Sequence, residues 1–240
     1  MRQIVDRFVS NGNKIFTMVE FKKNFPVEVL YKQSVVKNTL SEVLSSNNIS
    51  HSHIAESEKY AHVTYFFNGG NEKQFKHEKR FIIDSPKVKS FDEKPEMSSE
   101  KITETIMQEI DLNRPSIIAN FASPDMVGHT GNYDAALQAI AKLDECIGTI
   151  YNKCQEKDYV LLITADHGNA EVMFDTELNV IAKKHTNNKV PFIICNKEIE
   201  EKDGDWGYID SEFTLSDVAP TILSLYGIDK PSDMTGNSVL

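Results

Sequence analysis

The segment Tyr159–Glu171, which reads YVLLITADHGNAE, limits the possible folds of this chain more than any other. It opens with a continuous, largely apolar run, which is typical of a strand covered on both faces. The run stops abruptly at Asp166, His167 and Gly168. A sheet core gains nothing from a carboxylate beside an imidazole, whereas a metal ion would bind both. The segment therefore predicts a buried strand that ends either at a metal site or in a polar turn.

Two further apolar runs, Pro115–Ala122 and Val190–Cys195, also predict buried strands. A long helix is expected between the first two strands, from Tyr133 to about Gln155, because apolar residues recur there at intervals of three and four. Another helix is expected within Thr214–Ile228, ending at or just before Gly227. Strands that alternate with helices predict an α/β fold with a largely parallel sheet and helices on both faces.

The first third of the chain has a different pattern. A short amphipathic helix and a strand are expected over Arg2–Asn11 and Ile15–Phe21, and the aperiodic Val27–Lys37 is interpreted as a linker. Asn38–Asn48 predicts a helix, and Ser57–Phe67 predicts another that is capped by Ser57.

Composition bears on partners and location. The net charge of -10 argues against a nucleic-acid partner, and an anionic substrate would need local positive charge. The sequence contains neither a long apolar run nor a secretory signal, so we expect a cytoplasmic protein that does not span a membrane. Its three cysteines form no CxxC motif and are expected to be reduced.

The loop SPDMVGHTG (Ser123–Gly131) follows the first of the three apolar runs. Asp125 and His129 stand four residues apart in it, and Gly128 and Gly131 allow the backbone to fold tightly. Ligands of α/β proteins bind at the carboxyl ends of strands, so this pair is a candidate metal site. Taken alone, the motif is more typical of an aspartate that caps a turn and a surface histidine.

Asp166 and His167 form a second candidate pair. Neighbours on a strand point to opposite faces, so both residues serve one site only if the strand has ended, or else each faces a different ion. His185 precedes the third apolar run and would alone be read as a loop residue. Together, these carboxylates and imidazoles suit Mn²⁺ or Zn²⁺ better than Ca²⁺, and the absence of a cysteine ligand disfavours a structural zinc site.

Lys59 and His62 share one face of the predicted helix at a spacing of three. Lys59 could contact a phosphate as a point charge. Spacing alone favours a solvated lysine and a packed histidine.

Five motifs together resemble the cofactor-independent phosphoglycerate mutases of the alkaline phosphatase superfamily. In this chain they read EKYAHVTYFFNGG, SPKVKSFDEKPEM, NFASPDMVGHTG, LLITADHGNAE and HTNNKVPFII. The resemblance runs from Asn38 to about Gly236. It implies an alkaline phosphatase-like fold and an enzyme with two Mn²⁺ ions that interconverts 3-phosphoglycerate and 2-phosphoglycerate in glycolysis. It implies no requirement for 2,3-bisphosphoglycerate, and Mg²⁺, Co²⁺ and Zn²⁺ are alternative metals.

The resemblance also implies residue roles. Two sets of metal ligands are matched, one by Asp125, His129 and His185 and the other by Asp166 and His167. Lys59 matches a catalytic lysine that contacts the phosphoryl group and the nucleophile. In the family a serine takes the phosphoryl group and returns it to the other hydroxyl of the glycerate, and the metals lower the serine's pKa and neutralise the phosphoryl oxygens.

The chain departs from the family in length, because the family chain is roughly twice as long. The serine nucleophile, one aspartate ligand and the arginines that hold the glycerate lie in the unmatched part. We interpret residues 1–35 as the tail of the substrate-binding domain with a linker, and residues 36–240 as most of the phosphatase-like domain, incomplete at its N-terminal side. Arg2 and Arg7 are expected at the surface. Ser123 precedes a proline and shows no strand-to-helix elbow, so no nucleophile is expected in this chain.

Three functions remain open. The chain is the C-terminal part of a mutase and inactive alone, a non-catalytic metal-binding remnant or paralogue, or a metal-dependent phosphohydrolase of the same superfamily. The expected partners are a phosphoglycerate and either the missing N-terminal half or a second copy paired through an exposed sheet edge.

Overall fold

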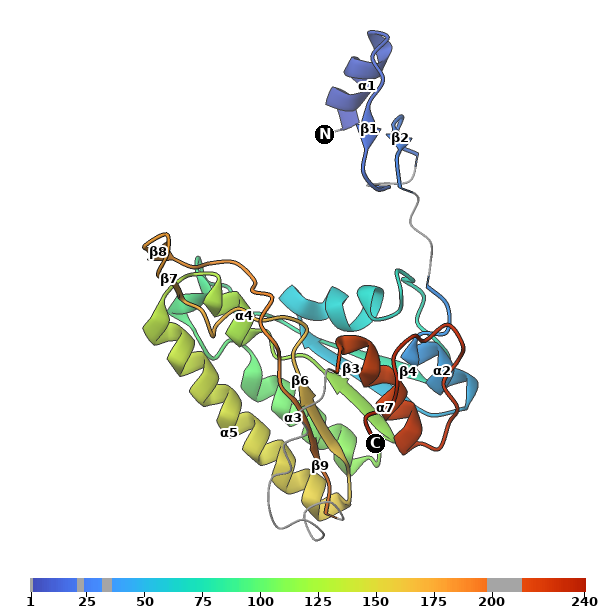
Figure 1. The fold of residues 1–240 in the computed structure, drawn as a ribbon, viewed down its shortest axis with the longest axis vertical. Coiled ribbons are helices and arrows are strands. Elements are labelled where there is room, and N and C mark those ends of the chain that lie inside the picture. Colours follow the sequence, from blue (N-terminus) through green and yellow to red (C-terminus); the bar gives the residue numbers. More distant parts are fainter. Residues whose placement is uncertain (1, 21–23, 32–35, 198–212) are drawn as a thin grey trace. The chain divides into compact units, whose positions relative to one another are not determined.

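The computed structural model describes residues 2–20, 24–31, 36–197 and 213–240. The chain divides into two units, Met1–Val36 and Lys37–Leu240 (Figure 1). All candidate site residues belong to the second unit.

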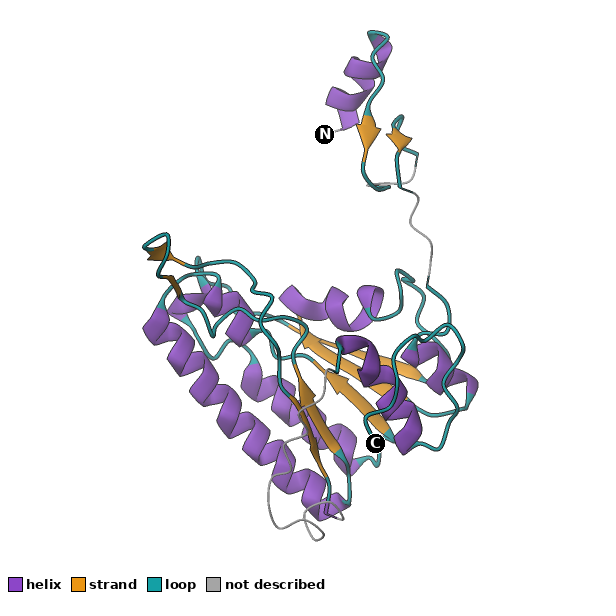
Figure 2. Ribbon diagram, viewed as in Figure 1, coloured by secondary structure: helices purple, strands orange, loops and turns teal. Residues whose placement is uncertain are grey.

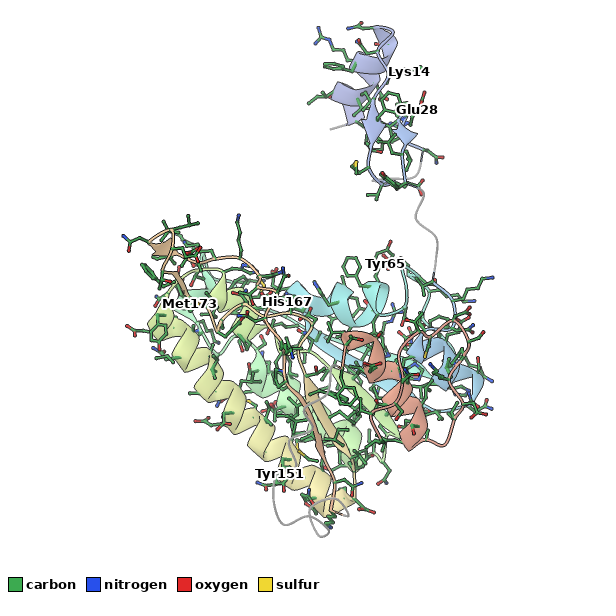
Figure 3. All side chains as sticks on the ribbon, in the orientation of Figure 1. Lys14, Glu28, Tyr65, Tyr151, His167 and Met173 are labelled. Carbon is green, nitrogen blue, oxygen red and sulfur yellow. The ribbon has the colours of Figure 1, made fainter. Side chains whose placement is uncertain are left out.

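The first unit has one helix and two short strands. The helix α1 spans Arg2–Ser10, as its apolar period predicts, and buries no residue; its two arginines are exposed, as expected. The strand β1 (Phe16–Thr17) pairs in parallel with β2 (Glu28–Val29), so part of the segment interpreted as a linker is a strand. Lys14 Nζ lies 3.0 Å from Glu28 Oε1 (Figure 3).

A three-stranded parallel sheet lies at the centre of the second unit (Figure 2). Its strand order is β4–β3–β5, with β3 at His51–Glu56, β4 at Glu78–Ile83 and β5 at Ser116–Ala119. The register places Ile54 of β3 opposite Phe81 of β4. All six residues of β3 are buried, as is typical of a central strand covered on both faces.

Two helices cover one face of this sheet. Ile54 joins a core with Ile102 of α3 (Ser99–Asp111) and Ile150 of α5 (Tyr133–Lys157). Each fully buried isoleucine of this kind contributes about 1.5–3 kcal/mol to stability. The helix α5 matches the long helix that the apolar period predicts.

Two other helices cover the opposite face. His53 is the neighbour of Ile54 on β3 and points the other way. Its Nε2 lies 3.3 Å from Ser41 Oγ of α2 (Leu40–Ser46). The helix α2 packs in turn against α7 (Val218–Leu225), through Leu44 and Leu223 (Figure 1). Helices therefore lie on both faces of a parallel sheet, as expected.

The remaining strands form two antiparallel pairs. β6 (Leu161–Thr164) pairs with β9 (Phe192–Cys195), and β7 (Phe174–Asp175) pairs with β8 (Val180–Ile181) in the connection between them. The three apolar runs are thus strands, as predicted, although only β5 belongs to the parallel sheet. Among the described strands of the parallel sheet and the β6–β9 pair, four have a partner on one side only, namely β4, β5, β6 and β9.

Two sequence expectations need correction. The strands β3 and β4 were not anticipated, because polar side chains interrupt their apolar pattern. Ser57–Phe67 is helical but irregular: it begins with the 3₁₀ turn Ser57–Lys59 and continues as the π-helical segment His62–Phe66. Ser57 does not cap it, and instead its Oγ donates to the Ile83 carbonyl at 3.3 Å.

All three cysteines are buried, and no disulfide joins them. Of the helices in the described part of the chain, none is long and apolar enough to cross a membrane.

Candidate metal centre

Asp125 and His129 lie on the short helix α4 (Ser123–Gly128) and at its C-terminal cap. This helix follows β5, and Pro124 stands in its first turn, where a missing N–H costs nothing. A spacing of four places both side chains on the same side of the helix. The helix therefore directs a carboxylate and an imidazole toward one point.

His167 and His185 come from two segments that lie side by side. His167 follows the end of β6 (Figure 3), and His185 precedes β9. An antiparallel bridge joins Gly168 to Thr186, with the Thr186 N–H donating to the Gly168 carbonyl at 2.8 Å. The two imidazole rings stack as a result, with centroids 3.6 Å apart and planes 19° from parallel.

The donor atoms of three residues form a small triangle. Asp125 Oδ1 lies 3.1 Å from His129 Nε2 and 3.2 Å from His185 Nε2. The two Nε2 atoms are 3.0 Å apart. An ion about 2.1 Å from each ligand holds neighbouring donors about 3.0–3.4 Å apart, so the triangle has the size that a divalent ion requires. Asp125, His167 and His185 also offer one donor each within 4.8 Å of one another.

The orientation of His129 supports the same conclusion. Its Nδ1 lies 2.8 Å from the carbonyl oxygen of Lys183, which can only accept, so Nδ1 carries the proton. In the neutral ring, Nε2 then presents a lone pair toward the carboxylate of Asp125. Two acceptors this close repel each other unless a proton or a metal ion lies between them, and a backbone carbonyl on the other ring nitrogen is the usual support of a metal-binding histidine.

Lys59 and Asn169 hold the carboxylate of Asp125 from two sides. Lys59 Nζ donates to Oδ2, while Asn169 Nδ2 donates to Oδ1 at 2.5 Å and to the backbone carbonyl at 3.2 Å. Burial by itself would raise the pKa of the Asp125 carboxyl, but the bonds from Lys59 and Asn169 outweigh it and hold the pKa below its ordinary value. Lys59 is buried, so the interpretation of it as a solvated lysine is wrong.

Three other residues differ in their surroundings. The Asp166 side chain is 59% exposed, and its Oδ2 lies 3.6 Å from His167 Nε2, so Asp166 stands outside the triangle. His62 is exposed, so the expectation of a packed histidine is wrong. Ser123 is fully buried, with its hydroxyl 3.4 Å from Ser99 Oγ, which leaves it unable to reach a substrate.

Two polar residues beside the cluster are not marked as functional by the sequence pattern. Asn169 contacts Asp125, and Glu171 accepts a hydrogen bond from the Asn169 N–H at 2.6 Å. An amide and a carboxylate after a strand resemble ordinary turn residues. Only their place in the motif that carries Asp166 and His167 could have drawn attention to them.

Comparisons with known proteins agree with this chemistry. The model of the Metalloenzyme superfamily matches residues 13–230. A 2,3-bisphosphoglycerate-independent phosphoglycerate mutase of Ehrlichia canis (strain Jake) is 49% identical over 238 residues, which cover 98% of this chain and 46% of the relative. One from Brugia malayi is 42% identical over 228 residues, covering 95% of this chain and 44% of the relative.

A solved structure is similar as well. Crystal structures of Leishmania mexicana phosphoglycerate mutase at low cobalt concentration include a chain that matches with a TM-score of 0.76 and 25% identity. The match covers 92% of this chain and 43% of that one. The chain thus spans less than half the length of the relatives that it matches.

Proposed function

The chain belongs to the Metalloenzyme superfamily, and from this we propose that it is the metal-binding part of a 2,3-bisphosphoglycerate-independent phosphoglycerate mutase. The reaction would interconvert 3-phosphoglycerate and 2-phosphoglycerate. One observation carries the proposal: Asp125, His129 and His185 bring three donor atoms within 3.2 Å of one another. The chain that carries these donors is 49% identical to such a mutase, and the match covers 98% of this chain.

Asp125, His129 and His185 would hold one divalent ion. Asp166 and His167 would serve a second ion, together with ligands from outside this chain. The mixture of carboxylate and imidazole donors favours Mn²⁺, with Mg²⁺, Co²⁺ and Zn²⁺ as alternatives. When bound, the ions would neutralise phosphoryl oxygens and lower the pKa of a serine hydroxyl.

Lys59 would act as the catalytic lysine. Its ammonium lies against Asp125, where it fixes the carboxylate and is close enough to the cluster to meet a phosphoryl oxygen as a point charge. The serine that accepts the phosphoryl group would come from outside this chain, because Ser123 is fully buried. We therefore expect the chain to be inactive alone.

The rest of a mutase would be the partner of this chain. The edges of β5 and β6 that lack a described neighbour present unpaired backbone groups, which a further strand would satisfy. We assign residues 1–35 to the tail of a substrate-binding domain and residues 36–240 to most of the phosphatase-like domain. A glycolytic reaction would place the protein in the cytoplasm.

Reconstitution tests this function. The chain is expressed together with the N-terminal part of the Ehrlichia canis relative that it does not match, and the interconversion of the two phosphoglycerates is measured with Mn²⁺. We expect metal-dependent activity from the pair, none from either part alone, and none when Asp125→Asn is introduced. A pair that forms a complex but shows no activity would refute the proposal.

A non-catalytic metal-binding protein is the second candidate, favoured by the buried state of Ser123. It would bind Mn²⁺ and remain inactive in the reconstituted complex. A phosphohydrolase of the same superfamily would instead release phosphate from an aryl phosphate in that complex without interconverting the phosphoglycerates.

A further inference from the structure

Glu171 joins the two segments that carry His167 and His185. Its carboxylate accepts hydrogen bonds from three groups: the Asn169 N–H at 2.6 Å, the Asn188 side-chain amide at 3.0 Å and the Thr186 hydroxyl. Asn169 lies on the segment of His167, whereas Thr186 and Asn188 lie on the segment of His185. One side chain therefore bridges two stretches that are 15 to 17 residues apart in sequence.

The bridge reinforces the backbone contact that stacks the two histidines. Gly168 and Thr186 immediately follow His167 and His185, and the Thr186 N–H donates to the Gly168 carbonyl at 2.8 Å. The hydroxyl of the same threonine donates to Glu171. Because backbone and side chain of Thr186 are both fixed to the opposite segment, His185 has little freedom to move away from His167.

The same network reaches Asp125. The backbone N–H of Asn169 donates to the carboxylate of Glu171. The side-chain amide of Asn169 donates to Asp125 Oδ1 at 2.5 Å. Asn169 is buried, at 6% exposure. Glu171 is thus connected through one residue, Asn169, to the carboxylate that forms one corner of the donor triangle.

Two glycines leave the space that the network occupies. A Cβ on Gly168 would lie 2.2 Å from Thr186 Oγ1 and 2.3 Å from Glu171 Oε1. A Cβ on Gly128 would lie 2.6 Å from Asn169 Oδ1. A Cβ does not approach nonbonded atoms this closely, so a side chain at either position would push the network apart.

We propose that Glu171 is a positioning residue that holds the segment of His185 against that of His167, so that the donors of Asp125, His129 and His185 are assembled before an ion binds. This inference rests on the metal site of the proposed function. Glu171 is not one of the donors of the triangle, because its carboxylate accepts from Asn169, Thr186 and Asn188. It acts through Thr186 and Asn169.

Glu171→Ala and Glu171→Gln, with Glu177→Ala as control, test this role in the full chain. Glu177 is also an exposed glutamate of the connection between β6 and β9 and takes no part in the network. Mn²⁺ affinity is measured by calorimetry at one fixed pH, and amide hydrogen exchange is measured without metal. Loss of an outer support of this kind weakens metal affinity by about 10- to 100-fold.

We expect Glu171→Ala to bind Mn²⁺ at least about tenfold more weakly and to exchange the Thr186 amide faster, with exchange in α5 unchanged. Glu171→Gln keeps one acceptor oxygen and should fall between this variant and the native chain, while Glu177→Ala should match the native chain. Unchanged Mn²⁺ affinity in Glu171→Ala, or weaker affinity accompanied by faster exchange throughout α5, would overturn the inference. If the native chain binds no Mn²⁺, the proposed function itself fails, and the Thr186 exchange rate still reports whether Glu171 joins the segments.

Discussion

Replacing Lys59 with methionine should reveal how strongly the ion pair with Asp125 stabilises the metal-free fold. Methionine keeps much of the apolar stem and removes the ammonium. The side chains of Lys59 and Asp125 are only 9% and 15% exposed, so the loss leaves a carboxylate largely shielded from water. The pair is therefore expected to matter more than a surface ion pair.

The expected cost follows from the surroundings of Asp125. Removing one partner of a buried ion pair costs about 3–5 kcal/mol. Asn169 continues to donate to Oδ1 at 2.5 Å, which offsets part of the loss. We expect Lys59→Met to lower the free energy of unfolding by about 2–3 kcal/mol at neutral pH.

The cost should also depend on pH. Lys59 helps to hold the pKa of Asp125 below its ordinary value, so the native pair stabilises the fold above that value and loses its effect as the pH falls through the lowered pKa. In the variant, burial would instead raise the pKa of Asp125. The carboxyl would then protonate as the pH falls toward its ordinary value of about 4, and the deficit of the variant should shrink.

Urea unfolding with a chelator present, at pH 7.5 and in mild acid, measures this deficit. Lys142→Met is the matched control, because Lys142 pairs with Glu100, whose side chain is 68% exposed, and such pairs contribute about 0–1 kcal/mol. A deficit for Lys59→Met no larger than that of the control, or one that is equal at both pH values, would refute the reasoning.

Three further predictions concern packing, pH and association. Gly128→Ala should lower the free energy of unfolding by about 1–3 kcal/mol and weaken Mn²⁺ binding, because the added Cβ would displace Asn169. Gly148→Ala is the control and should not destabilise the chain, because a Cβ there meets nothing within 4 Å. Equal effects of the two substitutions would contradict this. Burial lowers the pKa of His53 to about 4, so protonation of this residue favours the unfolded chain. The free energy of unfolding should therefore be highest above pH 6.5 and fall as the pH decreases toward 4. Urea midpoints that stay constant over that range would contradict this. Sedimentation should show self-association of the chain that the N-terminal part of a relative suppresses, and a monomer at all concentrations would contradict the role given to the edges of β5 and β6.

The sequence predicted the elements whose pattern is local. The run before Asp166 and the period of Tyr133–Gln155 identify β6 and α5, because continuous apolar strands and amphipathic helices are visible in a single stretch. The strand β3 could not be predicted in this way, because its burial depends on partners outside the local segment. Its Ser52 and His53 look like surface residues, yet they are buried because Glu109 and Ser41, distant in sequence, supply their hydrogen-bond partners.

The candidate site was predictable in its residues more than in its arrangement. Strand ends and the family resemblance both indicated Asp125, His129 and His185. Neither indicated that His167 stacks on His185, because that contact depends on the bridge between Gly168 and Thr186. Likewise, a lysine in an irregular helical segment looks solvated until the fold buries it against Asp125.

A titration of the metal-free chain with Mn²⁺, followed by electron paramagnetic resonance of the free ion, tests the central claim most directly. We expect the native chain to take up at least one ion, and we expect His185→Ala to abolish this binding while the exchange-protected core of α5 is retained. Native-like uptake by His185→Ala, or no uptake by the native chain, would contradict a metal site built on Asp125, His129 and His185.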